Sequence, residues 1–457
     1  EDFLADIDAL NPEEAMLYSL NVENLSEYSD PISASGNFNV GVAFNNFSGR
    51  VRGIDSAGRM RDFFNTNLQS DNYNLAGGIS VSSGPNAVVF GLGGTGGVIS
   101  TGYKRANVNR DTYGVDFRVD SEGAIRVVGD MNKVLVKDKL ALRAVALADD
   151  FETYRSGSQG EQERYFFSLT ASPWSSGSLT AYYENVSIYR GLPRNVVAYD
   201  GGVTAYLEHV ANGGAPYYDN SISNAIQPGW ENVVERLGQN RDYWYHTPDG
   251  QQTFIGRSNQ GTALNSVQTI DPSRADPDPL NRYRWSLPED SPVVSLEHNI
   301  HGLTTNRRMV GDVYGLIFTQ KLLDNLHLEL GYNFESGDTH YTSMAQPGAA
   351  VVRVDANLYL PDKVTPNPYK GMYYVDHWGQ STSDFNELES FRATLSWDLD
   401  FTEKSKWLGR HQIMGLYTKD QIDRMWSWLR TKTVHPDDVG SYIYNAGSGR
   451  GQGQTYY

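Results

Sequence analysis

Residues Asp71–Ala106 read DNYNLAGGISVSSGPNAVVFGLGGTGGVISTGYKRA, and this stretch decides how the rest of the chain is interpreted. Ile79–Ser82 and Val98–Ser100 have the alternating, β-branched composition of short strands. Between them, Gly84-Pro85-Asn86 is typical of a turn, because proline fixes φ while glycine and asparagine tolerate positive φ. Five glycines then fall between Gly91 and Gly97. This density indicates backbone that bends through positive φ or packs closely against other atoms.

A glycine-rich loop raises the question of a phosphate site. A P-loop ends in Lys-Ser/Thr and opens a helix, and the dinucleotide-binding fingerprint also leads into a helix. Here the last glycine leads into Val98-Ile99, which predicts a strand. This context argues against phosphate binding and favours a structural role for the glycines.

Several motifs within residues 17–105 occur in an order that resembles a known signature. They are Arg50-Val51-Arg52-Gly53, Arg61-Asp62-Phe63-Phe64, Asp71-x-Tyr73-Asn74, Ser83-Gly84-Pro85-Asn86-Ala87, Phe90-Gly91, Gly93-Gly94, Gly96-Gly97-Val98-Ile99 and Lys104-Arg105. This order is similar to the plug domain of TonB-dependent outer-membrane receptors. The resemblance implies a plug inside a membrane barrel, with structural roles for the residues of the motifs. They are Arg52, Gly53, Gly84, Pro85, Asn86, Phe90, Gly91, Gly96 and Gly97.

The chain departs from the family at one position and suggests ligand contacts at six others. The family usually has an arginine where this chain has Ser83, and that arginine and the one of the upstream Arg-Gly pair contact barrel glutamates. Arg52 matches only the second. In the family, the region between these motifs forms loops at the outward apex of the plug. The resemblance therefore makes Arg59, Arg61, Phe63 and Phe64 candidates for ligand contact, and His377 and Trp378 in a later aromatic loop are two further candidates.

Composition excludes several classes of protein. The 457 residues suffice for two domains or one large one, and the absence of cysteine excludes disulfides and thiolate metal sites. A net charge of −17 argues against nucleic acid as a partner, since binding to nucleic acid requires a basic face. No apolar run is long enough for a transmembrane helix. A membrane β-barrel remains allowed, because its strands alternate and stay polar on average.

From Asp111 onward the sequence alternates between apolar and polar residues, which is the period of a strand with two different faces. In one such segment, Leu326, Leu328 and Leu330 alternate with His327 and Glu329. The predicted strands are 111–120, 123–133, 139–154, 162–172, 178–190, 307–320, 326–340, 388–401 and 409–426. Short turns alternate with two long polar connections, 191–306 and 340–387, as in outer-membrane barrels. We predict an incomplete membrane β-barrel of about nine antiparallel strands with long outer loops, preceded by a small α+β plug domain.

The predicted domain limits are 1–107 for the plug and 108–457 for the N-terminal part of a transmembrane β-barrel. The barrel is expected to be truncated, because plugged transporters of this family have about 22 strands. Neither an energy-coupling segment nor a signal peptide is recognisable after Glu1, and Tyr456-Tyr457 end no alternating strand. Asn11-Pro12-Glu13-Glu14 predicts the start of a helix, with Asn at the N-cap and Pro at the first helical position.

The ionisable residues do not predict a catalytic or metal site. His298 and His301 are three apart in a stretch that does not suggest a helix, so they are expected on opposite faces. Acidic pairs such as Glu329/Glu335 could serve glycoside chemistry, but acids are common in polar barrel interiors. We predict that the protein is not an enzyme and has no cofactor, no metal site and no catalytic residue.

The resemblance implies energy-coupled uptake of a scarce, bulky solute, such as a siderophore, cobalamin or an oligosaccharide, across the outer membrane of a Gram-negative bacterium. The implied partners are the inner-membrane TonB complex, outer-membrane lipid and a small solute, with no nucleic acid. An alternative is an outer-membrane surface protein that binds glycans or mediates adhesion without transport. Solute accumulation that depends on the proton-motive force would separate the two.

Overall fold

The computed structural model describes much of the chain, with gaps that concentrate in the long connections. The described residues are 4, 6–7, 9–16, 18, 22–25, 48–51, 54–55, 58–76, 78–82, 97–154, 156–191, 199–200, 203–219, 221, 233–234, 242–246, 252–257, 269–270, 306–343, 351–359, 364–377, 380–402, 407, 409–430 and 452–456. No helix among them is long and apolar enough to cross a membrane.

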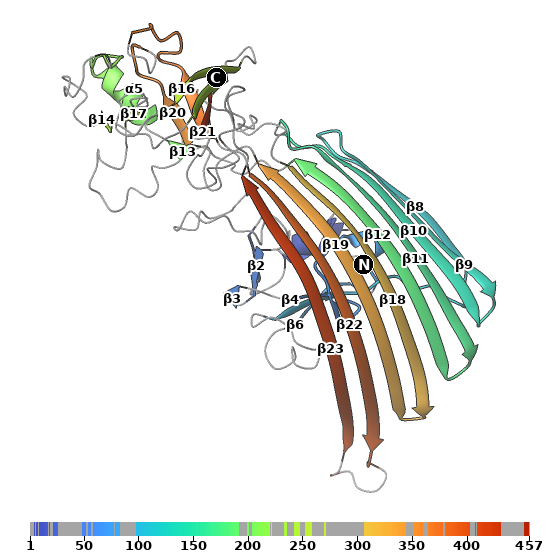
Figure 1. Cartoon of the computed structure of the whole chain (residues 1–457). Helices are drawn as coiled ribbons and strands as arrows, with labels where there is room; N and C mark the ends of the chain where they lie inside the picture. The colour runs from blue at the N-terminus through green and yellow to red at the C-terminus, as the bar shows by residue number, and fades with distance from the viewer. Residues whose placement is uncertain are drawn as a thin grey trace.

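The largest element is a curved antiparallel sheet, which we call the wall (Figure 1). Its nine strands are ordered β23-β22-β19-β18-β12-β11-β10-β9-β8, so each neighbour in space is the next wall strand in sequence. Their bounds are β8 Thr112–Val119, β9 Ile125–Val136, β10 Leu140–Phe151, β11 Gly160–Trp174, β12 Gly177–Gly191, β18 Asn306–Leu323, β19 Leu326–Ser343, β22 Gln380–Asp400 and β23 Arg410–Arg430. The nine predicted strands are confirmed, and β22 begins eight residues before the predicted 388.

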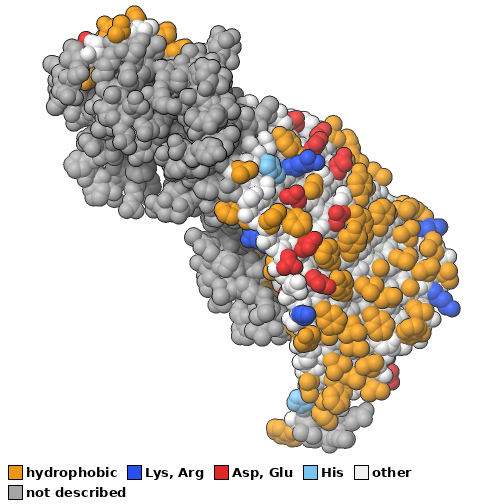
Figure 2. Space-filling model, viewed as in Figure 1, with side chains coloured by type: hydrophobic (Ala, Val, Ile, Leu, Met, Phe, Trp, Pro, Cys, Tyr) orange, Lys and Arg blue, Asp and Glu red, His pale blue; other side chains and the backbone are white. Residues whose placement is uncertain are grey.

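Alternation along each strand gives the wall two different faces. In β11, Gln162, Arg164 and Ser168 are buried against the N-terminal part of the chain, whereas Tyr165 and Phe167 between them are exposed. Figure 2 shows hydrophobic side chains spread over the other, outward face of the wall. The period of two places apolar groups on the convex face, whereas the concave face carries polar groups together with apolar side chains that pack against the N-terminal domain.

The two ends of the wall differ. Short turns at 137–139, 175–176 and 324–325 join consecutive strands at one end, the short-turn end. The opposite, long-loop end carries the connections 192–305 and 344–379 (Figure 1). The sequence alone predicted no regular structure in these connections, but they contain a helix and a second sheet.

The elements at the long-loop end come from distant parts of the chain. They are α5 Val203–Ala211, β13 Tyr199–Asp200, β14 Val233–Val234, β15 Asp242–His246, β16 Gln252–Arg257, β17 Thr269–Ile270, β20 Val351–Val354, β21 Tyr373–His377 and β24 Gln452–Tyr456. Six of them form one sheet in the order β13-β20-β21-β24-β15-β16. The last residues, for which we predicted no alternating strand, thus contribute β24 to this loop sheet rather than to the wall.

The N-terminal domain is small and mixed, as predicted. It contains α2 Pro12–Met16, β1 Val22–Leu25, β2 Ser48–Val51, β3 Ile54–Asp55, β4 Gly58–Arg61, β5 Phe64–Asn65, the 3-10 turn η1 Asn72–Asn74, β6 Ser80–Ser82 and β7 Val98–Thr101. The predicted N-cap of α2 is confirmed, since the Asn11 side chain accepts a hydrogen bond from the Glu14 N–H (2.9 Å). Glu14 in turn accepts from the Leu10 N–H (2.7 Å).

The main core lies between the N-terminal domain and the concave face of the wall. Phe64, Leu68, Tyr73 and Tyr103 of the N-terminal domain pack against a set of wall side chains. The wall residues are Val145, Leu147, Phe166, Tyr182, Val186, Ile188, Met309, Val313 and Ile317. The two parts of the chain therefore share one core.

Candidate functional site

The segment Arg61–Asn74 lies across the concave face of the wall, and we call it the strap. It starts in a hairpin in which Arg61 of β4 pairs with Phe64 of β5. The two connecting residues, Asp62 and Phe63, have φ values of 48° and 66°. Two consecutive positive φ values are those of a type I′ turn, which matches the twist of the strands.

Apolar side chains of the strap fit over glycines of the wall. A Cβ on Gly331 of β19 would lie 2.7 Å from the Phe64 ring. A Cβ on Gly311 of β18 would lie 2.6 Å from Leu68, and one on Gly337 of β19 would lie 3.2 Å from it. Glycine at these positions permits a close approach that no other residue allows without a shift.

A wall carboxylate holds the middle of the strap. Glu335 of β19 accepts hydrogen bonds from the Thr66 hydroxyl (2.5 Å) and from the backbone N–H groups of Asn67 (2.6 Å) and Leu68 (3.2 Å). Its side chain is fully buried. One carboxylate thus satisfies three donors that the strap presents to the wall.

A second buried carboxylate, Glu184 of β12, joins the strap to the wall by charge. It accepts hydrogen bonds from the Arg61 guanidinium (2.5 Å), the Tyr73 hydroxyl (2.8 Å) and the Tyr103 hydroxyl (2.6 Å). Arg164 of β11 lies 3.6 Å from its other oxygen. Burial raises the pKa of both tyrosines well above the ordinary value, so they remain protonated donors. Two guanidinium groups and two hydroxyls compensate the desolvation of one carboxylate.

The end of the strap reaches the long-loop end of the wall. Asp71 accepts hydrogen bonds from Arg126 of β9 (2.6 Å) and Gln162 of β11 (2.9 Å), and Arg126 also pairs with Asp149 of β10 (2.6 Å). Burial alone would raise the pKa of Asp71, but the positive charges of Arg126 and Arg164 outweigh it and hold the pKa below its ordinary value. Asp71 is therefore ionised at neutral pH.

Two arginines bind Gln69 of the strap between these anchors. Arg164 donates to its backbone carbonyl (2.7 Å) and Arg307 of β18 to its side-chain oxygen (3.0 Å). Both arginines are almost completely buried. Asn67 also donates to Asn386 of β22 (3.3 Å) and Asn65 to Asp420 of β23 (3.1 Å), so the strap bonds to strands from β9 to β23.

The chain leaves the N-terminal domain through a segment that is also fixed to the wall. The side chain of Asn132 on β9 accepts from the Asn107 N–H (2.8 Å) and donates to the carbonyls of Asn107 (2.9 Å) and Arg110 (2.7 Å). The Ala106 N–H donates to Ser168 of β11 (3.3 Å). The start of the wall is thereby held against the wall's own concave face.

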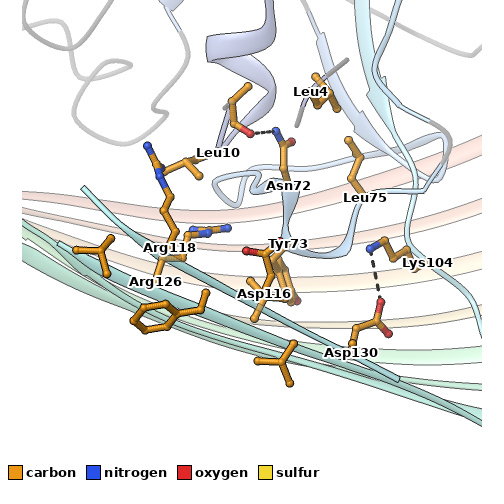
Figure 3. Close-up of a pocket in the computed structure, with 16 residues that line it drawn as sticks. Leu4, Leu10, Asn72, Tyr73, Leu75, Lys104, Asp116, Arg118, Arg126 and Asp130 are labelled. Carbon is orange, nitrogen blue, oxygen red and sulfur yellow. Dashed lines mark hydrogen bonds and ion pairs between the residues drawn. The ribbon is translucent and has the colours of Figure 1, made fainter. Parts of the chain in front are cut away.

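A cavity of about 730 Å³ separates the N-terminal residues from the first two wall strands (Figure 3). Its lining residues come from three parts of the chain. They are Leu4, Ala9 and Leu10; Asn72, Tyr73, Leu75 and Lys104; and Gly114, Val115, Asp116, Phe117, Arg118, Val119, Arg126, Val128 and Asp130. Its size is that of a pocket for a small molecule. Within the described residues, no group of three or more His, Cys, Asp or Glu side chains could hold a metal ion.

The four apex candidates lie in or beside the strap. Arg61 is 8% exposed and engaged by Glu184, and Phe64 is buried over Gly331. Phe63 is partly exposed, with the Arg392 guanidinium 4.8 Å from its ring centre. Arg59 donates to the Asn67 carbonyl (3.4 Å).

The resemblance implied that these residues lie at the outward apex of the plug, and the structure places Phe64 nearer to the short-turn end of the wall. Gly331, its contact, lies nearer to Leu326 at the short-turn end of β19 than to Ser343 at the long-loop end. The reason is that the tight turn at Asp62-Phe63 lies on the short-turn side of Arg61, which contacts Glu184 in the middle of β12, and the chain runs toward the long-loop end only after this turn. Asp71 occupies that end instead.

Most of the predicted plug residues lie outside the described residues: Arg52, Gly53, Gly84, Pro85, Asn86, Phe90, Gly91 and Gly96, as does Trp378. His377 is the last residue of β21, and the structure describes only its backbone. Gly97 is buried with φ 137°, a conformation that favours glycine, and its carbonyl accepts from the Gly58 N–H (2.9 Å).

Sequence reasoning did not single out Glu184 or Arg126, named Glu335 only in an acidic pair and gave Asp71 only as part of a plug motif. The wall residues could have been found from the alternation of their strands, because each is a charged residue on the face opposite the exposed apolar side chains. Gly311, Gly331 and Gly337 occupy positions of β18 and β19 on the same face, and a glycine within an alternating strand is a signal of close backbone approach.

Comparison with solved structures shows which fold this is. The chain matches FpvA of P. aeruginosa bound to heterologous pyoverdines, with TM-score 0.54 and 10% identity, over 95% of this chain and 43% of FpvA. It matches BauA, the ferric preacinetobactin receptor from Acinetobacter baumannii, with TM-score 0.54 and 9% identity, over 95% of this chain and 47% of BauA. It also matches the outer membrane receptor FpvA from Pseudomonas aeruginosa PAO1 bound to pyoverdine, with TM-score 0.53 and 9% identity, over 94% and 47%.

These structures are TonB-dependent siderophore receptors, and the described fold is that of part of such a receptor. The chain spans less than half the length of each of the three. No profile of a known protein family matches the sequence, and no curated protein matches it. At 9–10% sequence identity, the similarity to these receptors shows a shared fold only.

Proposed function

We propose that this chain belongs to a TonB-dependent receptor that takes up a scarce, bulky solute across the outer membrane of a Gram-negative bacterium. Residues 1–107 would be its plug and residues 108–457 the first part of its barrel. The wall's apolar convex face would contact lipid, and its polar concave face would line the lumen that the plug fills. The partner that supplies energy would be the inner-membrane TonB complex.

The observation that carries this proposal is the way the strap is bound. A plug that only filled space would need apolar contacts, but this one is held by Glu184, Glu335 and Asp71 through buried charges and hydrogen bonds. Breaking one buried ion pair costs about 3–5 kcal/mol, so thermal motion rarely opens several together. Such a closed state requires an external input of work before a solute can pass.

The solved receptors of this fold are described as binding pyoverdine or as a ferric preacinetobactin receptor. We therefore propose a siderophore as the first solute class to test, followed by cobalamin and oligosaccharides. No catalytic role is proposed for any residue.

The test is accumulation of solute by cells that produce the whole protein carrying this chain. Radioactive iron loaded on a panel of siderophores, cobalamin and labelled oligosaccharides would serve as probes. We expect at least one probe to accumulate, and dissipation of the proton-motive force to abolish accumulation. Binding at the cell surface without accumulation would instead support a glycan-binding or adhesive protein.

A further inference from the structure

The cavity beside the first two wall strands combines apolar and charged surfaces. Leu4 and Leu10 lie on its N-terminal side, and Asp116 and Arg126 belong to the wall strands that bound it on the other (Figure 3). Leu75 and Val128 extend the apolar part. A solute in this cavity would meet leucine side chains as well as the polar concave face of the wall.

Most charged groups around this cavity already have partners. Lys104 pairs with Asp130 (3.5 Å), and Arg143 pairs with the same carboxylate (2.5 Å). Arg126 pairs with Asp71 and Asp149, and the charge of Arg118 also acts on Asp149. These interactions leave the positive groups compensated by carboxylates.

Asp116 differs from Asp130, the other acidic residue that lines the cavity, because Asp130 is paired with Lys104 and Arg143. Asp116 stands on β8 opposite Val128 of β9, on the same face as Arg126, and its side chain is exposed. Within the part of the chain that the structure describes, it has neither a hydrogen bond nor an ion pair. An accessible carboxylate beside an apolar surface can bind a cation with its apolar attachment, because both parts of such a molecule find a complementary group.

We propose that this cavity is a binding site for a solute that joins a cationic group to an apolar body. Asp116 binds the cation, and Leu4, Leu10 and Leu75 contact the body. This inference rests on the proposed uptake function and names a class of solute for it. Molecules that are anionic throughout find no unpaired positive group here and are disfavoured.

The strap residues Asn72 and Tyr73 line the cavity, and Asn72 bonds to its N-terminal side. The Asn72 side chain donates to the Ala9 carbonyl (2.9 Å) and its N–H donates to the Leu10 carbonyl (2.9 Å). The neighbouring residue, Asp71, is bound to Arg126 of the wall. Displacement of residues 4–16 would therefore remove one side of the cavity. It would also break the two hydrogen bonds of Asn72, next to the end of the strap that is bound to the wall.

Binding of two small probes tests the proposal. Tyramine carries a protonated amine and an aromatic ring, and 4-ethylphenol is its neutral counterpart. Equilibrium dialysis would measure both against the whole protein in detergent. We expect Asp116→Asn to weaken tyramine binding about tenfold, the effect of about 1.4 kcal/mol, and to leave 4-ethylphenol binding unchanged. Asp398→Asn, at an exposed position of β22 outside the cavity, should change neither.

Equal tyramine affinity in the wild-type and Asp116→Asn proteins, or no tyramine binding at all, would overturn the assignment. A matched thermal unfolding curve shows that the variant folds, as expected for an exposed side chain. The uptake assay is independent of this result. Energy-dependent accumulation without an Asp116 effect rejects the site alone, and tyramine binding without accumulation rejects the uptake function alone.

Discussion

Single residues already show how the strap is held on the wall, and Glu184 is one of its buried carboxylate anchors. Glu184→Gln removes the charge that compensates Arg61 and Arg164, both buried, and we expect a cost of about 3–5 kcal/mol. Because the loss is local, hydrogen–deuterium exchange of residues 61–74 should accelerate at least 100-fold. Glu163→Gln on β11 is the matched control, since that side chain is exposed and should change exchange little. Unchanged protection of the strap in Glu184→Gln would contradict its role.

Asp71 and Asp62, nine positions apart, should respond to pH with opposite signs. The pKa of Asp71 is lowered, because Arg126 and Arg164 outweigh the effect of burial, so it adds stability above its unfolded pKa of about 3.9. That stability is lost as pH falls through the folded pKa. Burial raises the pKa of Asp62 despite Arg105 nearby, so Asp62 adds stability below the unfolded pKa and loses it as pH rises through the folded pKa.

Calorimetry of the two asparagine variants checks these signs. Asp71→Asn should lower the unfolding temperature at pH 7 by an amount that shrinks toward pH 3, because the wild-type carboxylate then becomes protonated as well. Asp62→Asn should raise the unfolding temperature at pH 7 and have little effect at pH 3. Asparagine also tolerates the positive φ of this turn position. The same sign of change at pH 7 in both variants would rule out this account.

Among the elements, the fit between the strap and the β18–β19 pair is tested by adding one methyl group. Gly331→Ala would press a Cβ against the Phe64 ring, and overpacking of this kind costs about 1–3 kcal/mol. Gly129→Ala on β9 is the control, because nothing lies within 4 Å of its Cβ position. Phe64→Leu combined with Gly331→Ala should recover part of the loss in a double-mutant cycle of unfolding free energies. Additive effects would mean that the two residues do not contact each other.

The same elements show what local sequence can predict. Period-two alternation predicted each wall strand, and Asn11 with Glu14 predicted the start of α2, because these signals lie within a few residues of one another. The contacts of the strap have no such signal. Arg61 is 123 residues from Glu184, and Thr66 is 269 residues from Glu335. The turn at Asp62-Phe63 was also missed, since phenylalanine at positive φ carries no turn signature and is held there by its surroundings.

For the whole molecule, the question is whether the strap leaves the wall during the proposed uptake. The strap bonds to strands from β9 to β23, and the connecting segment is fixed by Asn132. Opening a passage through the lumen by moving the strap would break contacts along most of the wall together. Strap release would then be a single cooperative step with a large cost, which the proposed energy-coupling partner would have to supply.

A cross-link can decide whether this step occurs. The chain has no cysteine, so two introduced cysteines would react without background. Asn67 of the strap and Asn386 of β22 are suitable, because their side-chain amides lie 3.3 Å apart. In the whole protein carrying Asn67→Cys and Asn386→Cys, a short bis-methanethiosulfonate cross-linker, which forms a disulfide with each cysteine, should abolish uptake, and a reducing agent that cleaves these disulfides should restore it. Each single variant with the same reagent is the control and should retain uptake. Full uptake by the cross-linked protein would mean that the strap stays on the wall and that the passage opens elsewhere in the plug.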